Sequence, residues 1–137
     1  MDCLFCKIIK KEIKAEIIYE DEEALAVLDV HPKAPGHTMI LPKVHADNLL
    51  DLPDEKVGPV FQAVKKVTEI IKKSLKSDAF TIGINNGKYS GQVIDHLHIH
   101  IIPRWQGDGG KSIHSVVDNV PKESLEEIKK RILLELT

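Results

Sequence analysis

Long hydrophobic runs are absent from this sequence of 137 residues. No run approaches the roughly 20 consecutive apolar residues that a membrane-spanning helix requires, so we expect no membrane partner. The opening segment MDCLFCKIIKKEIK also lacks the longer apolar centre and the small-residue cleavage site of a secretory signal. These absences predict a cytoplasmic protein.

An excess of charge of one sign is also absent. The formal net charge is −2 at pH 7, and the lysine and arginine residues are scattered instead of forming a basic stripe. Proteins that bind nucleic acids usually carry such a stripe, so we expect no nucleic-acid partner and favour a small-molecule partner. The length of the chain is typical of one domain and suffices to bury one hydrophobic core. We therefore expect a single domain over residues 1–137.

Hydrophobic periodicity predicts both helices and strands. Apolar residues three or four positions apart predict a long helix from about Asp54 to Lys76 and a final helix from about Pro121 to Leu136. Helices and strands do not alternate regularly, so we predict an α+β fold with about five strands in a mostly antiparallel sheet. A short N-terminal helix is expected at 4–11, and the strands at 16–21, 24–30, 37–43, 79–85 and 96–102.

The long helix carries an apolar stripe, which predicts that this face is buried. Gly58 and Pro59 lie near its start, and a proline beyond the first turn removes a backbone hydrogen bond. The pattern therefore allows either a kink at this point or a helix that begins later. The stripe consists of Val57, Val60, Val64, Val67, Ile71 and Leu75.

Three of the seven histidines lie at every second position of the segment DHLHIHIIPR, residues 95–104. Side chains of a strand alternate between its faces, so His96, His98 and His100 are expected on one face and the apolar residues between them on the other. The outer two histidines would begin about 13 Å apart, whereas a zinc–imidazole bond is only about 2 Å long. One metal ion therefore cannot easily hold all three, and we expect different roles for them. A solvated polar face is the simpler alternative, but it would favour threonine, lysine or glutamate.

Cysteine is scarce, and the only two cysteines form the motif C-x-x-C at Cys3 and Cys6. In a cytosolic protein such a pair indicates metal binding or redox chemistry before a structural disulfide. A thioredoxin-like pair would begin a helix within a βαβ unit, and this pair does not. A structural zinc site needs four ligands, commonly two cysteines and two histidines, and His45 and His96 are the candidates. Two small buried apolar residues without a metal are the alternative.

The segment HLHIHII resembles the signature of the histidine triad family, in which three histidines alternate with hydrophobic residues and two further hydrophobic residues follow. Four other segments resemble parts of that family in the same order: CLFCKII, LDVHPKAPGHTMILPKVH, NNGKYSGQ and IIPRWQGDGG. The resemblance covers about residues 2–110 and leaves a C-terminal helical extension at about 121–136. It implies the histidine triad (HIT) fold, with a long central helix.

The resemblance implies a phosphoramidase-type hydrolysis or transfer at the α-phosphorus of an adenosine or other purine nucleotide. In the family this reaction passes through a covalent nucleotidyl-histidine intermediate, and His98 matches the nucleophile. Histidine suits this role because its usual pKa of about 6.5 leaves much of it neutral near pH 7. His100 and His37 match the supporting histidines, which contact phosphate oxygens and assist proton transfer.

The resemblance also implies a nucleotide-binding site around His98 and His100. Gln92 and the backbone N–H groups of the SGQV loop match the groups that hold the phosphate. Asn85 matches a position beside the α-phosphate, and Asp29 matches an acidic residue that binds the ribose hydroxyls. Val93 replaces a hydroxyl residue of many members, so a side-chain hydrogen bond to the phosphate or leaving group is lost. The base pocket would consist of Leu4, Phe5, Ile8, Leu28 and Val30.

Some prokaryotic-type members of the family carry a zinc site that resembles Cys3, Cys6, His45 and His96. The resemblance therefore implies one structural zinc ion per chain. The family usually forms homodimers, so a homodimer is expected here as well.

Three other functions stay open on the sequence. The segment IIPR followed by GDG is shared with diadenosine polyphosphate hydrolases, so the sequence does not separate that branch from the phosphoramidases. Histidines that hold a catalytic zinc ion would define another class of enzyme, although the cysteines favour a closed metal site. A nucleotide-binding module without catalysis is the third alternative.

Overall fold

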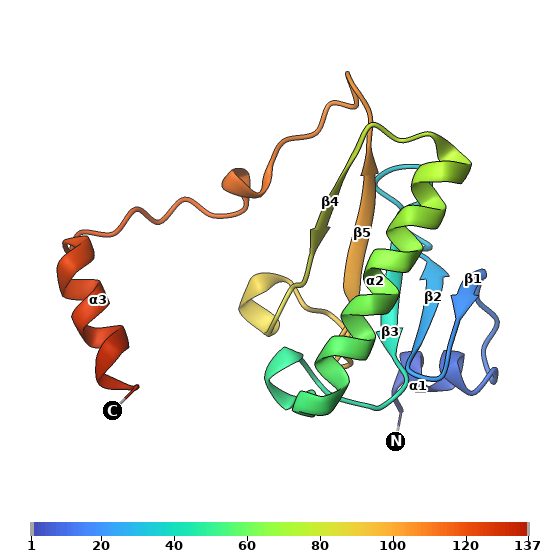
Figure 1. The fold of residues 1–137 in the computed structure, drawn as a ribbon, viewed down its shortest axis with the longest axis horizontal. Coiled ribbons are helices and arrows are strands. Elements are labelled where there is room, and N and C mark those ends of the chain that lie inside the picture. The colour runs from blue at the N-terminus through green and yellow to red at the C-terminus, as the bar shows by residue number, and fades with distance from the viewer. Residues whose placement is uncertain (1, 137) are drawn as a thin grey trace.

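A five-stranded antiparallel sheet forms the centre of the computed structural model, which describes residues 2–136 (Figure 1). The strand order is β1-β2-β3-β5-β4, and every neighbouring pair is antiparallel. The predicted α+β fold is thereby confirmed. The strands are β1 (Ile17–Glu20), β2 (Ala24–Leu28), β3 (Thr38–Pro42), β4 (Ala79–Gly83) and β5 (Ile99–Arg104). The helices are α1 (Leu4–Ile9), α2 (Asp54–Leu75) and α3 (Leu125–Leu134), with short 3-10 turns η1 (Leu49–Asp51), η2 (Lys88–Ser90) and η3 (Ile113–Ser115).

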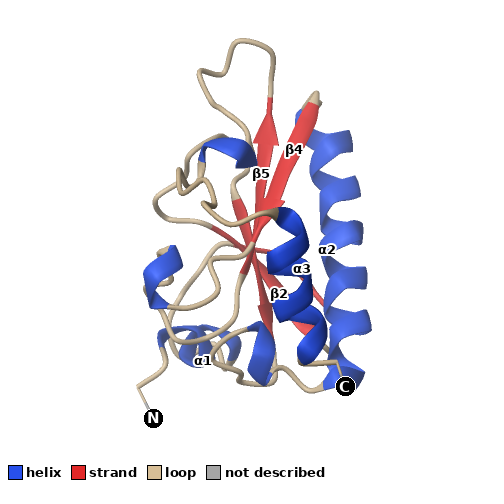
Figure 2. Cartoon of the chain, turned by 90° about the vertical axis from the view of Figure 1, so that its left-hand side faces the viewer, coloured by secondary structure: helices blue, strands red, loops and turns tan. Residues whose placement is uncertain are grey.

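The two faces of the sheet are covered by different elements. Figure 2 shows α2 along one side of the sheet, with α1 and the long loops on the other side. Side chains alternate between these faces, so Ala24 and Ala26 of β2 join the core beneath α2, while Leu25 and Val27 join the core beside α1. The core beneath α2 contains Ile40, Val60, Val64, Val67, Ile71, Leu97, Ile99 and Ile101, and the core beside α1 contains Phe5, Ile8, Met39 and Leu41.

Helix α2 begins at Asp54 and includes Pro59, so the alternative of a later start is wrong. A proline at this position costs the helix only the bond from its missing N–H to the carbonyl of Glu55, close to the N-terminus. The middle of the predicted apolar stripe is buried, whereas its ends, Val57 and Leu75, are 36% and 42% exposed. The sheet therefore covers the central turns of the helix.

The triple-histidine segment enters the sheet later than predicted, because β5 begins at Ile99 and not at His96. The N–H of Leu97 donates to the carbonyl of Ala46 at 2.7 Å, outside the sheet. Register pairs between β3 and β5 start only at Ile99, opposite Ile40. The predicted division of faces still holds, since Leu97 and Ile99 are buried beneath α2.

The C-terminal segment lies apart from the sheet (Figure 1). Ser124 caps α3 by accepting the N–H of Glu127. No residue of α3 between Leu125 and Leu134 is buried, so its apolar side chains join neither core. Within residues 2–136 no helix is long and apolar enough to cross a membrane.

Candidate active site and metal centre

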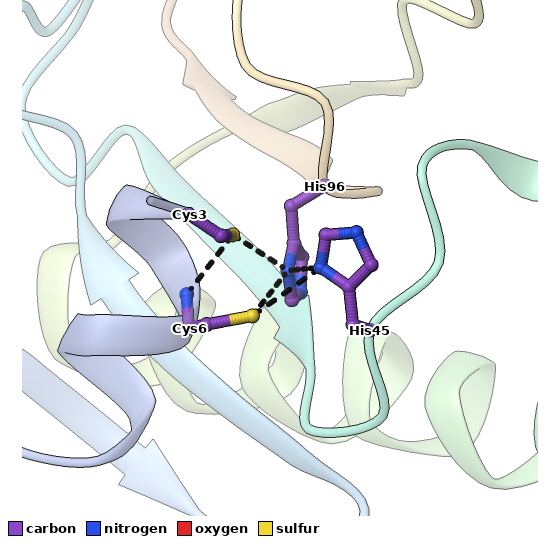
Figure 3. A group of neighbouring side chains, drawn as sticks. All are labelled: Cys3, Cys6, His45 and His96. Atoms are coloured by element: carbon purple, nitrogen blue, oxygen red, sulfur yellow. Dashed lines mark hydrogen bonds between the residues drawn. The ribbon is translucent and has the colours of Figure 1, made fainter. Parts of the chain in front are cut away.

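Four sulfur and nitrogen atoms meet where α1, the loop after β3 and the segment before β5 come together (Figure 3). The predicted ligands Cys3, Cys6, His45 and His96 supply these atoms, which all lie within 4.8 Å of one another. The two Nδ1 atoms are 3.1 Å apart, and three of the four sulfur–nitrogen distances are 3.3–3.5 Å. A tetrahedral zinc ion bound at about 2.0–2.3 Å would separate its ligand atoms by roughly 3.3–3.8 Å, which is close to the spacing in this cluster. The donor set and its spacing therefore fit zinc.

The outer nitrogens of both histidines are engaged elsewhere. His96 Nε2 donates to the carbonyl of Pro42 at 2.9 Å, and His45 Nε2 donates to Asp47 Oδ1 at 2.9 Å. A neutral imidazole with a proton on Nε2 carries its lone pair on Nδ1, so both lone pairs face the two sulfur atoms. Ligand histidines are commonly oriented by such second partners. The sequence analysis did not predict Asp47 and Pro42 as the hydrogen-bond partners of the ligand histidines. The only signal in the sequence was the carboxylate of Asp47, two positions after His45.

His98 immediately precedes β5 and is 9% exposed. Its Nδ1 lies 2.8 Å from the carbonyl oxygen of His96. A carbonyl only accepts hydrogen bonds, so Nδ1 carries a proton, and in the neutral form of the ring the lone pair is on Nε2. The rings of Phe5 and His100 stand edge-on to His98, each with a centroid separation of 5.1 Å. The hydrogen bond at Nδ1 and the two edge-on rings thus fix the orientation of the His98 ring, with Nε2 on the opposite side from the carbonyl.

His37 and His100 form a second hydrogen-bonded unit. The backbone N–H of Lys33 donates to His37 Nδ1 at 3.1 Å, so the proton of a neutral His37 is on Nε2. This Nε2 donates to His100 Nδ1 at 2.9 Å, which places the remaining proton of His100 on Nε2. Asp29 Oδ2 lies 3.5 Å from His37 Nε2. Asp29, His37 and His100 lie close enough together to hold a metal ion. The lone pair of His37, however, already accepts the N–H of Lys33. The geometry of the unit instead favours hydrogen-bond donation by His100.

Gly36 allows the loop before β3 to approach the C-terminal end of α2 and strand β5 closely. Its φ is +83°, and a Cβ atom there would lie 2.5 Å from Leu75 Cδ1 and 3.3 Å from Pro103 Cγ. A larger residue would therefore clash and would also strain the backbone. This close approach holds His37 in place, directly after the glycine.

Burial lowers the pKa of His37, and it lowers the pKa of His100 to about 4, with neighbouring His98 and His37 adding to the effect on His100. Both rings are therefore neutral at pH 7. An unfolded chain would bind a proton at His100 near pH 6.5, whereas the folded chain resists it down to about pH 4. The contribution of His100 to the free energy of unfolding is therefore fully present above pH 6.5 and is lost as the pH decreases towards 4.

When the pH is lowered from 7 to 5, we expect the free energy of unfolding to fall by about 2 kcal/mol because of His100 alone. Urea unfolding at the two pH values measures this loss, and the variant His100→Asn serves as the control because it lacks the group. A loss of equal size in His100→Asn would contradict the assignment.

The predicted phosphate loop is braced by Gln92, which is buried. Gln92 Oε1 accepts the N–H of Gly87 at 2.8 Å, and Nε2 donates to the carbonyls of Asp47 and Ile94 at 2.6 and 2.9 Å. The amide therefore connects the loop to the segment after His45 and is not directed outward.

Replacing Gln92 with alanine leaves these three backbone groups without their partner. We expect the free energy of unfolding to fall by about 2 kcal/mol. Urea unfolding measures this effect. Tyr89→Ala is the control, since Tyr89 is fully exposed on the same loop. An unfolding free energy equal to that of the wild type would refute the bracing role.

Asn85 and Val93 lie at the two ends of this loop. Asn85 packs beside Gly91, whose φ is +104° and whose added Cβ would lie 3.8 Å from Asn85 Cγ. Val93 is 91% exposed, so it offers an apolar surface to solvent.

The residues predicted for the base pocket differ in exposure. Phe5 and Ile8 are buried, whereas Leu4 is 42% and Val30 is 80% exposed. A depression of about 420 Å³ brings together three of the predicted site residues. Its lining consists of Leu28, Asp29, Pro32, Lys33, Ala34, Pro35, Gly36 and His37.

The sheet, the single long helix and the alternating histidines define a known class of protein. The model of the HIT domain matches residues 10–107. The chain therefore belongs to the HIT family, and the predicted family fold is confirmed. The match begins after the two cysteines and ends before the C-terminal segment.

Individual relatives support the same conclusion. The chain is 45% identical over 128 residues to an uncharacterised HIT-like protein of Methanocaldococcus jannaschii, which covers 93% of this chain and 98% of that protein. It is 34% identical over 134 residues to an adenosine 5′-monophosphoramidase of Saccharomyces cerevisiae, and the match covers 98% of this chain and 82% of the yeast protein. The solved structure of a zinc-bound histidine triad family protein from Mycobacterium smegmatis superposes with a TM-score of 0.75 at 32% identity, covering 99% and 96%.

Proposed function

We propose that this protein is a nucleotide phosphoramidase, a hydrolase or transferase that acts at the α-phosphorus of an adenosine or other purine nucleotide. The observation that carries the proposal is the 2.8 Å contact between His98 Nδ1 and the His96 carbonyl oxygen, because this contact makes Nδ1 the donor and leaves the Nε2 lone pair of the neutral ring free to attack. The yeast relative named an adenosine 5′-monophosphoramidase supports the class of reaction.

In the proposed reaction, the His98 Nε2 lone pair forms a bond to the α-phosphorus while the bond from phosphorus to the leaving nitrogen breaks. The leaving amine takes the bonding pair and a proton from solvent. His100, kept neutral by burial, donates its Nε2–H to a phosphate oxygen, and His37 keeps His100 in this tautomer. Water then attacks the phosphorus, releases AMP and a proton, and regenerates neutral His98.

Intact-protein mass spectrometry tests the covalent step. After rapid quenching without acid, wild-type protein that is turning over adenosine 5′-phosphoramidate should carry the added mass of one adenylyl group, and His98→Asn should not. Turnover without any adduct would argue against the nucleotidyl-histidine. A panel containing diadenosine polyphosphates identifies the preferred leaving group, and binding of nucleotide without turnover of any member would favour a binding module.

We also propose one structural zinc ion per chain, held by Cys3, Cys6, His45 and His96. All four tetrahedral positions would be filled by the protein, so zinc would stabilise the fold and would leave no open position for substrate. The chain's own residues, and not the metal, would then carry the chemistry.

We further propose a cytoplasmic homodimer in which residues 1–137 form one domain. Apolar side chains on the outer surface of α2 and on edge strand β4 remain partly exposed in one chain, including Phe61, Ile70 and Ile82 at 38–41%. Light scattering after size exclusion tests the proposal, since a mass of one chain would refute the dimer.

A further inference from the structure

The metal centre and the proposed nucleophile share two structural links. His96 directs a ring nitrogen into the metal centre, and its backbone carbonyl accepts the Nδ1–H of His98 at 2.8 Å. Phe5 lies between Cys3 and Cys6 on α1, and its ring stands edge-on to His98 at a centroid distance of 5.1 Å. We propose that the metal centre positions His98 for attack through the His96 carbonyl and through Phe5, an inference that rests on the proposed function.

The first link is the carbonyl of His96. Both ring nitrogens of this residue are engaged, Nδ1 in the cluster of ligands and Nε2 with the carbonyl of Pro42, and the residue is completely buried. The following N–H, of Leu97, donates to the carbonyl of Ala46, the residue next to ligand His45. The backbone between His96 and His98 is therefore connected to the metal centre twice. One connection is the ring of His96, and the other is the hydrogen bond from Leu97 to the neighbour of His45.

This carbonyl decides which nitrogen of His98 can react. While it accepts the Nδ1–H, the lone pair of a neutral His98 must be on Nε2. Without a fixed acceptor, neutral imidazole exchanges its proton between both nitrogens and rotates more freely. A bound metal ion that holds His96 in place would thus also select the reactive tautomer of His98.

The second link is Phe5. Its ring is 4% exposed and contacts both histidines edge-on, with centroid distances of 5.9 Å to His96 and 5.1 Å to His98. Helix α1 has only six residues, and a helix of this length is not stable by itself. The two ligand cysteines lie on either side of Phe5, so a bound metal would keep this turn of helix against the histidines.

Phe5 is therefore a positioning residue, and this role differs from that of a base-binding residue in kinetics. Loss of a contact to the base would raise the KM or the Kd for AMP and leave kcat unchanged. Loss of orientation at His98 would lower kcat and leave nucleotide affinity unchanged, because misplacement of a nucleophile acts on the transition state.

Histidine-ring nitrogen NMR of the full chain tests the first link directly. In the zinc-loaded protein we expect His98 to show a single neutral tautomer with the proton on Nδ1. After zinc is removed with a chelator, we expect signals of both tautomers and a kcat lower by about tenfold for adenosine 5′-phosphoramidate. An unchanged His98 tautomer after zinc removal would overturn the inference. The spectrum requires no turnover, so it tests the inference separately from the proposed function. Failure of the proposed function would instead be revealed by full turnover in His98→Asn.

The variant Phe5→Leu tests the second link while all four metal ligands remain. We expect an unchanged zinc content, a KM within about twofold of the wild type and a kcat lower by about tenfold. Leu25→Ala is the matched control, because Leu25 is fully buried in the same apolar cluster. It should lower the melting temperature comparably and leave kcat unchanged. A wild-type kcat in Phe5→Leu, a change confined to KM, or an equal fall of kcat in the control would each overturn the positioning role.

Discussion

Replacing His98 with asparagine should lower kcat for adenosine 5′-phosphoramidate by about 10⁴-fold or more. Asparagine has no basic lone pair with which to attack phosphorus, and removal of a covalent nucleophile typically costs this much. The Kd for AMP should stay within a few-fold of the wild type, since the loop and the neighbouring histidines remain. Single-turnover kinetics and calorimetric titration measure the two quantities.

His114→Asn is the control for this experiment, because His114 lies in η3, away from the sheet, and its exposed ring forms a hydrogen bond with Ser112. It should retain the kcat of the wild type. If His98→Asn kept more than about one hundredth of the wild-type kcat, a residue other than His98 would have to be the nucleophile.

Replacing Cys6 with alanine should reduce the zinc content from about one ion per chain to nearly none. Three ligands no longer close a tetrahedral site, and the binding free energy of a structural metal is part of the folding free energy. We expect the melting temperature to fall by about 10 °C, which for a chain of this size corresponds to roughly 3 kcal/mol. Elemental analysis and calorimetry measure both changes.

Lys7→Ala provides the matched control, since Lys7 follows Cys6 on α1 and its side chain is 41% exposed. It should keep both the metal and the melting temperature. Wild-type protein without zinc, together with an unchanged melting temperature in Cys6→Ala, would show that the two cysteines are only apolar packing residues.

The architecture could be predicted largely because it depends on local periodicity. Short, largely apolar runs bounded by turn residues identified the strands, alternation identified the histidine strand, and the valine stripe identified α2. The start of β5 was wrong by three residues, because the backbone of Leu97 bonds to Ala46 in a distant loop. No local pattern encodes such a contact, and it replaces the sheet pairing that the alternation predicts.

The predicted metal ligands come together, because the coordination chemistry of zinc restricts which side chains can complete a pair of cysteines. The partners of these ligands were less accessible to prediction. The carbonyl of Pro42 carries no sequence signal, since every residue has one. The inward orientation of Gln92 depends on the position of Asp47, which lies 45 residues away in the chain.

The proposed metal centre would also constrain the order in which this protein assembles during synthesis. Cys3 and His96 are separated by 93 positions, so the centre closes a loop that spans most of the chain. On the ribosome the cysteines and His45 would emerge first, and the set of four ligands would stay incomplete until residue 96 has left the exit tunnel. A contact of such long range forms late and slowly, because the entropy of closing the loop must be overcome first. We therefore expect the newly made chain to pass through a period in which both thiols are open to oxidants and to competing metal ions.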